Sequence, residues 1–167
     1  MKKIIATICL VFGIISCSNA QKKEFSKEAL SETMQSREGN KFTFQEILNK
    51  HKGKTIVIDV WASWCPDCIK GMPKVQALQE KYPQVAYVFL SYDKTPEAWQ
   101  AGISKYNVRG DHYLILSNWK GGGFKEYADI DWIPRYIVVD KTGKVALYRA
   151  IEADEEQLIT TLNNLTK

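Results

Sequence analysis

The chain has 167 residues, 45% hydrophobic and 25% charged, which is enough for one well-packed core and too few for two full domains. Its formal net charge is +4, and Lys2 and Lys3 at the very start supply two of these charges. A surplus this small excludes the strongly basic nucleic-acid-binding classes, so we expect no nucleic-acid partner.

The first twenty residues predict export. A short basic start precedes an apolar run over residues 4–15, which is too short to span a bilayer as a stable helix. We therefore predict a secretory signal peptide over residues 1–16 and a mature protein in the bacterial envelope or periplasm. We favour a lipoprotein signal, because Cys17 follows the apolar run in a segment that resembles the bacterial lipobox. Cys17 would then carry the lipid that anchors the protein to a membrane, and cleavage after Ala20 is the alternative.

The residues after the signal lead into one predicted domain. Residues 17–39 are expected to form a loosely held polar tether and the start of an N-terminal hairpin, and residues 40–167 the domain itself. Thr43 and Glu46 fit a capping box, which predicts a short helix that ends at about Lys50.

Residues 55–61 form an almost continuous apolar, β-branched run, which predicts a strand buried on both faces. Asp59 interrupts this run. A buried carboxylate is costly unless it is paired or protonated, so Asp59 is either a misplaced edge residue or an acid with a tuned pKa. We favour the acid, because the strand leads directly to two cysteines and Asp59 could exchange a proton with Cys68.

The rest of the chain alternates predicted helices and strands, with Gly121–Gly123 as a flexible turn. The predicted helices cover residues 65–81 with a kink at Pro73, 95–106, 124–129, and a closing helix that starts at a capping box of Asp154 and Gln157. The predicted strands cover residues 85–92, 113–116, 136–139 and 145–149. This order predicts an α/β sandwich that ends in an antiparallel hairpin and a helix.

Two thiols lie three residues apart in Trp64-Cys65-Pro66-Asp67-Cys68, at the start of a predicted helix. This spacing places both side chains on one helix face, close enough to form a disulfide. A helix N-terminus stabilises a thiolate, so Cys65 is the predicted exposed nucleophile and Cys68, one turn deeper, the resolving thiol. Pro66 suits the first helical position. Trp64 either packs at the rim or shields the sulfur and contacts the substrate.

Other cofactor chemistry fits this motif poorly. A structural zinc site needs four ligands, but after residue 17 the chain has no third cysteine and only His51 and His112. His51 is predicted to be a solvated surface residue and His112 a loop residue. A c-type haem attachment needs a histidine where the chain has Ile69. We therefore expect no metal and no cofactor beyond a redox-active Cys65–Cys68 disulfide, and an exported chain with a single thiol pair favours catalysis over structural cross-linking.

The segment 59–68, together with Ile133-Pro134 and the closing hairpin and helix, resembles the exported thiol-disulfide oxidoreductases of the TlpA/ResA type. The resemblance covers about residues 40–165. It implies a thioredoxin-like three-layer α/β/α sandwich with a mixed sheet and an inserted helix and strand at about residues 96–116.

The resemblance also implies roles for individual residues. Cys65 would attack the substrate disulfide, Cys68 would resolve the mixed disulfide, and Asp59 would be the buried acid. Pro134 would be cis and face the cysteine pair, and Ile133 would offer its backbone to an extended substrate. The expected substrate-binding residues are Trp64, Pro66, Asp67, Ile133 and Pro134.

Pro66-Asp67 replaces the Gly-Pro of thioredoxin, which bears on the direction of the reaction. The Asp67 carboxylate opposes the Cys65 thiolate and competes for the same helix N-terminus, so we predict a reductant rather than an oxidant. The predicted function is therefore an extracytoplasmic reductase of disulfides in envelope proteins, re-reduced by an upstream thiol donor. The alternatives are a disulfide oxidase or isomerase on the same site, a Cu(I) metallochaperone that binds through the two thiolates, and a non-catalytic binding module.

Overall fold

The structure is a computed structural model that describes residues 22–107, 109–117 and 119–167. The predicted signal peptide, Cys17 and the alternative cleavage site at Ala20 lie outside the described residues. Within the described ranges, no helix is long and apolar enough to cross a membrane.

A seven-stranded mixed sheet forms the centre of the fold, with the strand order β2-β1-β5-β4-β3-β6-β7. Strands β3, β4 and β5 run parallel to one another, and every other pairing is antiparallel. All six residues of β3 are buried, as the sequence predicts. The strand bounds are β1 (Thr33–Ser36), β2 (Lys41–Thr43), β3 (Ile56–Trp61), β4 (Ala86–Ser91), β5 (Asp111–Ile115), β6 (Arg135–Val139) and β7 (Val145–Ala150).

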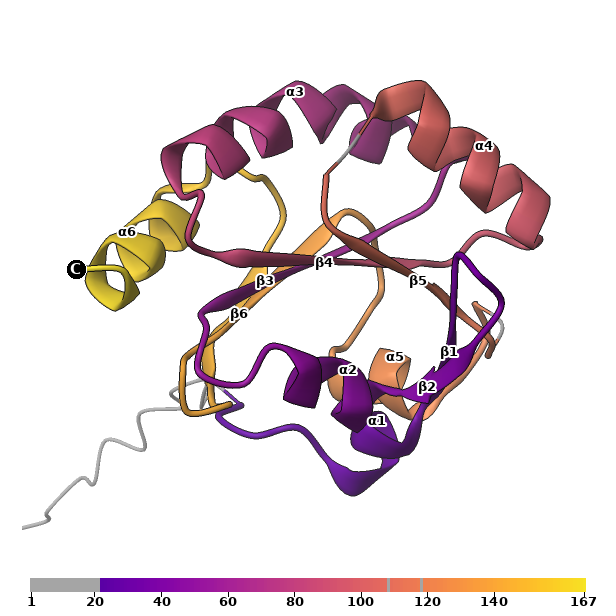
Figure 1. The fold of residues 1–167 in the computed structure, drawn as a ribbon, viewed down its shortest axis with the longest axis horizontal. Coiled ribbons are helices and arrows are strands. Elements are labelled where there is room, and N and C mark those ends of the chain that lie inside the picture. Colours follow the sequence, from indigo (N-terminus) through magenta and orange to yellow (C-terminus); the bar gives the residue numbers. More distant parts are fainter. Residues whose placement is uncertain (1–21, 108, 118) are drawn as a thin grey trace, which may run out of the picture.

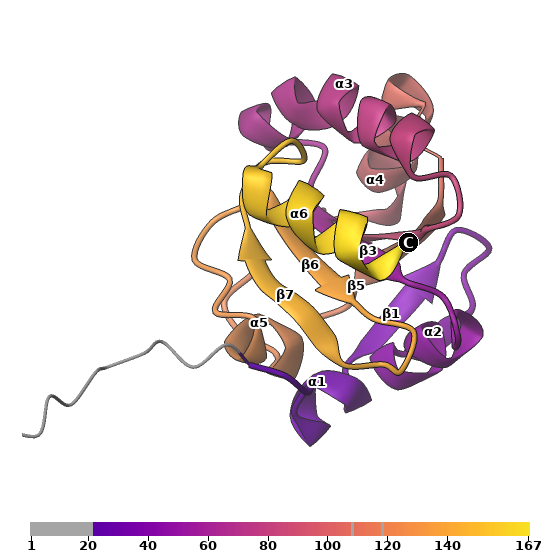
Figure 2. The same cartoon turned by 90° about the vertical axis from the view of Figure 1, so that its left-hand side faces the viewer.

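Helices cover both faces of this sheet, which confirms the predicted sandwich (Figure 1). Helices α3 and α4 lie on one face and α1, α2 and α5 on the other, while α6 packs along β6 and β7 (Figure 2). The predicted inserted unit is α4 with β5. The helix bounds are α1 (Lys27–Ser31), α2 (Phe44–Lys50), α3 (Pro66–Lys81), α4 (Pro96–Tyr106), α5 (Gly123–Tyr127) and α6 (Glu156–Leu165).

Two predicted helix starts are confirmed by their capping groups. Thr43 and Glu46 form the reciprocal capping box that opens α2. Cys65 is the N-cap of α3, with Pro66 at its first position. Helix α3 continues through Pro73, and a kink there stays a prediction.

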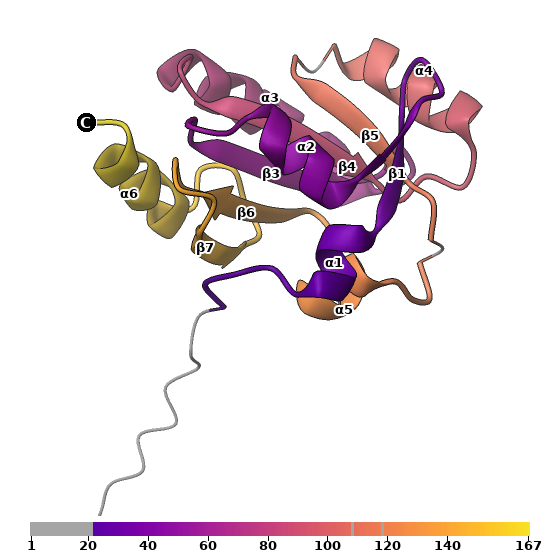
Figure 3. The same cartoon turned by 60° about the horizontal axis from the view of Figure 1, so that its bottom comes forward.

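The described part of the predicted tether, residues 22–39, has more regular structure than its polar composition suggests. It contains α1 and β1, and Ala29 and Met34 are both fully buried. Helix α1 packs against α5, as Figure 3 shows from below. A Cβ at Gly123 would lie 2.4 Å from the carbonyl oxygen of Glu28, so the last glycine of the expected turn is instead the first residue of α5 and is in close contact with α1.

Three further expectations are wrong. His112 lies within β5, is 6% exposed and stacks on Phe89. The His51 side chain is 13% exposed, and its Nε2 lies 2.9 Å from a carboxylate oxygen of Asp111, because α2 packs beside the start of β5. The capping box expected at Asp154 is absent: α6 begins after Glu155, without a side-chain cap.

Candidate active site

The two cysteines form a disulfide between the end of β3 and the first turn of α3. Their Cα atoms are 5.3 Å apart, which confirms the predicted pairing. Cys65 is 4% and Cys68 2% exposed. The prediction of a shielded Cys68 is confirmed, whereas the expected exposure of Cys65 is wrong, because its sulfur is covered in the oxidised protein.

The Cys65 sulfur lies between a helix N-terminus and a loop. Its Sγ accepts a hydrogen bond from the backbone N–H of Cys68 at 3.1 Å, an interaction that also stabilises a thiolate once the disulfide opens. The same Sγ lies 3.5 Å from the carbonyl oxygen of Ile133. The Ile133-Pro134 peptide bond is cis, as expected. The structure thus brings together Cys65, Cys68, Ile133 and Pro134.

Asp59 lies on the sheet face that α3 covers. It is 2% exposed and stands opposite Tyr136 in the antiparallel register of β3 and β6. A Cβ at Gly71 of α3 would be 3.7 Å from the Tyr136 hydroxyl, which places that face beneath α3. Burial raises the pKa of Asp59 to about 8, while the Tyr136 hydroxyl opposes the rise. That hydroxyl lies close by without the geometry of a formed hydrogen bond, and neither Asp59 oxygen has a partner among the described residues.

The surface around the disulfide carries exposed aromatic side chains. Trp64 is 50% exposed; its Nε1 donates to the carbonyl oxygen of Tyr92 at 3.4 Å and its ring meets that of Trp119 edge to face. Pro66 and Asp67 are exposed as well. Trp132, which the sequence analysis does not single out, is 61% exposed and directly precedes Ile133. Exposed tryptophans on both segments that meet at Cys65 are typical of a surface that binds other proteins.

A second buried carboxylate, Asp93, holds the turn before Cys65. Its two oxygens accept hydrogen bonds from the backbone N–H of Ser63 at 3.0 Å, the Ser63 hydroxyl at 2.6 Å and the Ser91 hydroxyl at 2.8 Å. The sequence analysis missed Asp93. Its signal was a carboxylate at the carboxyl end of a strand predicted to be buried, where the ends of parallel strands meet.

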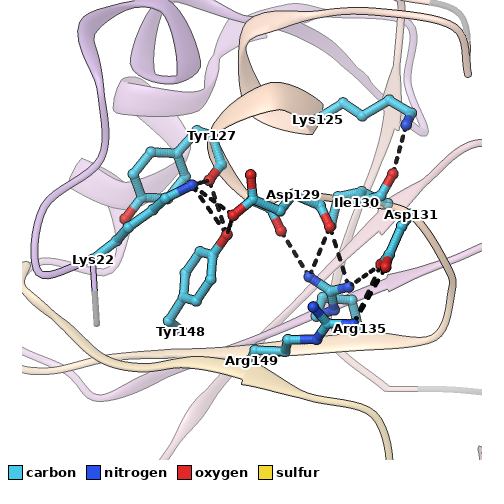
Figure 4. A network of polar contacts seen from close by, with 10 residues as sticks. Lys22, Lys125, Tyr127, Asp129, Ile130, Asp131, Arg135, Tyr148 and Arg149 are labelled. Atoms are coloured by element: carbon cyan, nitrogen blue, oxygen red, sulfur yellow. Dashed lines mark hydrogen bonds and ion pairs between the residues drawn. The ribbon is translucent and has the colours of Figure 1, made fainter. Parts of the chain in front are cut away.

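Arg135 organises the loop that carries Ile133 and Pro134 (Figure 4). Its side chain is fully buried, and its guanidinium donates to the carbonyl oxygens of Ala128 at 2.7 Å and Asp129 at 3.3 Å and to the carboxylate of Asp131 at 2.7 Å. Arg135 is the first residue of β6, and in the sequence it looks like an ordinary charge at the end of an apolar strand, so its burial could not be recognised there.

The same network ties the start of the described chain to this loop. Lys22 Nζ lies 2.8 Å from the Asp129 carboxylate and 3.1 Å from the Tyr148 hydroxyl, and it also donates to the carbonyl oxygen of Tyr127. The loop before Pro134 is therefore held from two sides, by Arg135 beneath it and by Lys22 beside it.

An α/β sandwich with a Cys-x-x-Cys disulfide at a helix N-terminus, next to a cis-proline, is the arrangement of a dithiol-disulfide exchange protein. Residues 53–145 match the thioredoxin-like family, so the chain belongs to that family.

Relatives and solved structures agree with this assignment. The chain is 29% identical to the thiol-disulfide oxidoreductase ResA of Bacillus cereus over 151 residues, which are 89% of this chain and 83% of the relative. It is similar to the solution structure of a protein from Bacteroides vulgatus described as a thiol-disulfide oxidoreductase, with a TM-score of 0.69, 29% identity and coverage of 84% and 90%.

A secreted disulfide oxidoreductase from Mycobacterium tuberculosis shares the fold, with a TM-score of 0.59, 20% identity and coverage of 81% of this chain and 96% of the other.

The chain described here is a thiol-disulfide oxidoreductase that uses Cys65 and Cys68 and exchanges with disulfide-containing substrates and thiol electron donors.

Proposed function

We propose that the protein is a membrane-tethered, extracytoplasmic reductase of disulfides in envelope proteins. One observation carries this proposal: the Cys65 sulfur lies at a helix N-terminus and against the Ile133 carbonyl, next to exposed tryptophans. A sulfur in this place combines thiolate stabilisation with a backbone group that an extended substrate can reach.

The reaction proceeds in two exchanges. The Cys65 thiolate attacks a substrate disulfide; a Cys65–substrate bond forms and one substrate thiolate leaves. Cys68 then gives its proton to Asp59 and attacks the Cys65 sulfur, so that the Cys65–Cys68 bond forms and the second substrate sulfur leaves as a thiolate and takes a proton from solvent. The oxidised protein is re-reduced by two further exchanges with a thiol donor.

Asp59 suits this step because of where it lies and how it is solvated. Burial holds its pKa at about 8, near the working pH of a general acid or base. It also lies on the face covered by α3, the helix that carries Cys68.

The substrate surface comprises residues from both segments at the disulfide. Trp64, Pro66 and Asp67 are exposed on the cysteine side and Trp132 on the loop side. The side chains of Ile133 and Pro134 are buried, so the substrate contacts the backbone of these two residues.

A Cys68→Ala variant tests the proposal directly, because it cannot resolve the mixed disulfide. In the native envelope, we expect Cys65 of this variant to trap substrates and the donor as adducts that a reducing agent releases. The matched control is the Cys65→Ala, Cys68→Ala double variant, which should trap nothing. Absence of any adduct specific to Cys65 would refute catalysis and favour a binding module.

The direction and the location need two separate measurements. Alkylation in intact cells should find Cys65 and Cys68 mostly reduced, whereas a mostly oxidised pair would indicate an oxidase. Membrane anchoring through Cys17 predicts that a Cys17→Ser variant loses both lipid labelling and membrane association. A protein that stays cytoplasmic would contradict the proposed location.

A further inference from the structure

A buried acid needs a route by which its proton reaches water. Asp59 is 2% exposed, and in the proposed reaction it takes a proton from Cys68 in every cycle. That proton must leave before Asp59 can act again. The polar side chain opposite Asp59 is Tyr136, its cross-strand neighbour in β6, and its hydroxyl lies near the Asp59 carboxylate.

Tyr136 connects Asp59 with a cavity beside the active site. Tyr136 is 1% exposed, yet it lines a cavity of about 200 Å³ together with Gly71 and Pro134. Exposed residues form other parts of the wall, namely Asp67, Lys70 and Trp132. A cavity of this size, with polar groups in its wall, has room for a few water molecules.

We propose that the Tyr136 hydroxyl passes the proton of Asp59 to water in this cavity, and that Tyr136 is thereby a positioning residue for the resolution step. The proposal rests on the acid role proposed for Asp59. When Asp59 gives up its proton, the Tyr136 oxygen accepts it and the phenolic proton moves to a cavity water. The phenol is neutral before and after, and the proton taken from the Cys68 thiol ends in solvent.

The surroundings keep Tyr136 suited to this role. Burial and the nearby Asp59 hold the pKa of Tyr136 well above its usual value, so the phenol is protonated at the start of each cycle and has a proton to pass on. Other charged groups also face Tyr136. They are Asp67, Lys70 and Lys74 from α3 and Glu152 and Asp154 from the segment after β7. Lys74 pairs with Glu152 and with Asp154, the latter at 3.0 Å, so the charges near the cavity partly neutralise one another.

Single-turnover kinetics with an aromatic disulfide that releases a coloured thiolate, 5,5′-dithiobis(2-nitrobenzoate), separate the two exchanges. Attack by Cys65 on this probe releases the first thiolate at a rate proportional to probe concentration. Attack by Cys68 on the mixed disulfide releases the second thiolate at a rate that does not depend on probe concentration. We expect Tyr136→Phe to slow the second phase about tenfold or more and to alter its pH profile, while the first phase changes by less than about twofold.

Matched variants separate the possible outcomes. Tyr87→Phe removes another buried tyrosine hydroxyl, which donates to the Leu78 carbonyl oxygen, and should leave both phases unchanged. Asp59→Asn should slow the second phase, and adding Tyr136→Phe to it should slow that phase no further. If Asp59→Asn slows the second phase and Tyr136→Phe does not, the role of Tyr136 is refuted and that of Asp59 stands. If Asp59→Asn has no effect, the proposed acid is wrong.

A second variant tests the same route should Tyr136→Phe fold poorly. Gly71→Ala keeps both Asp59 and Tyr136 but places a methyl group 3.7 Å from the hydroxyl, on the side where a cavity water would lie. We expect a slower second phase and an unchanged first phase. An unchanged second phase in Gly71→Ala, with the variant correctly folded, would contradict the route through this cavity.

Discussion

Two carboxylates are buried in or just after neighbouring strands, β3 and β4. They differ in hydrogen bonding. Asp93, just after β4, is 6% exposed and accepts hydrogen bonds from both Ser63 groups and from Ser91. Asp59, in the middle of β3, is 2% exposed and has no formed hydrogen bond among the described residues. Burial alone therefore does not distinguish the acid that holds a turn from the acid that we propose as a proton acceptor.

The surroundings of the two carboxylates differ as well. Ser63, which donates to Asp93, is tightly packed against α4, because a Cβ at Gly102 would lie 2.5 Å from the Cβ of Ser63. Beside Asp59 the Tyr136 hydroxyl borders a cavity. A carboxylate with several hydrogen-bond donors suits a fixed turn, whereas one with few partners, next to a residue that borders a cavity, suits a group whose charge changes.

The largest expected effect concerns the pH dependence of stability. Since the pKa of Asp59 is about 8 in the folded protein, against 3.8 for an unperturbed aspartate, folding takes up a proton between these values. The contribution of Asp59 to the free energy of unfolding is therefore fully present below about pH 4 and is lost as the pH rises towards about 8. Asp59→Asn should remove this loss, so that the free energy of unfolding of the variant exceeds that of the wild type by up to about 6 kcal/mol near pH 8. Urea unfolding of the oxidised proteins across this range measures it, and a constant difference would contradict it.

Removal of Asp93 should affect the fold at any pH. Asp93→Ala leaves three donors of Ser63 and Ser91 without their acceptor, so we expect a loss of about 3 kcal/mol in the free energy of unfolding. Ser63→Ala removes only one of these bonds and should cost about 1 kcal/mol. Equal losses in the two variants would show that Asp93 does not act as a shared acceptor.

The same chemical change in two helices tests the difference in packing. Gly102→Ala should cost about 1–3 kcal/mol, because the new methyl group overlaps Ser63. Gly71→Ala meets only the Tyr136 hydroxyl at 3.7 Å and should gain up to about 1 kcal/mol from its better helix propensity. Thermal unfolding of both variants measures the two changes in stability. Changes of the same sign would contradict the difference in packing between the two sites.

An exposed carboxylate, Asp67, should have a smaller effect than either buried one. Asp67 lies in the first turn of α3, and Asp67→His replaces a negative group beside the Cys65 sulfur by one that can be positive. The reduced thiolate then gains stability, so we expect the reduction potential to rise by about 30 mV, which corresponds to about 1.4 kcal/mol. Equilibration with a glutathione buffer measures this. A lower potential in Asp67→His than in the wild type would refute the argument that Asp67 favours a reductant.

Local patterns were enough for the disulfide and for Asp59. Cys65 and Cys68 share a helical turn, and Asp59 is conspicuous in an apolar run, so no knowledge of distant contacts was needed. Tyr136 could not be recognised in this way, because only the register of β3 with β6 places it opposite Asp59. His112 was misplaced for a similar reason: β5 begins two residues earlier than its apolar pattern shows.

Some errors came from short polar signals that tertiary contacts overrode. Asp154 and Gln157 have the spacing of a capping box, but Asp154 pairs with Lys74 of α3 instead. The three glycines at residues 121–123 looked like a flexible turn. Gly123, however, lies so close to the backbone of α1 that no side chain would fit there. Both contacts join residues far apart in the chain, so neither can be predicted from the residues around Asp154 or Gly123 alone.

Strand β6 begins with two residues that serve opposite sides of the sheet. Arg135 holds the loop carbonyls of Ala128 and Asp129, while Tyr136 faces Asp59 beneath α3. Side chains alternate between the two faces of a sheet along a strand. A register shift of one residue between β6 and β3 would therefore place Arg135 on the face where Tyr136 now lies, and Tyr136 on the other. Such a shift would bring the Arg135 guanidinium beneath α3 and leave the loop without its anchor. The register of β6 with β3 therefore decides both which group faces Asp59 and whether the loop before Pro134 is held.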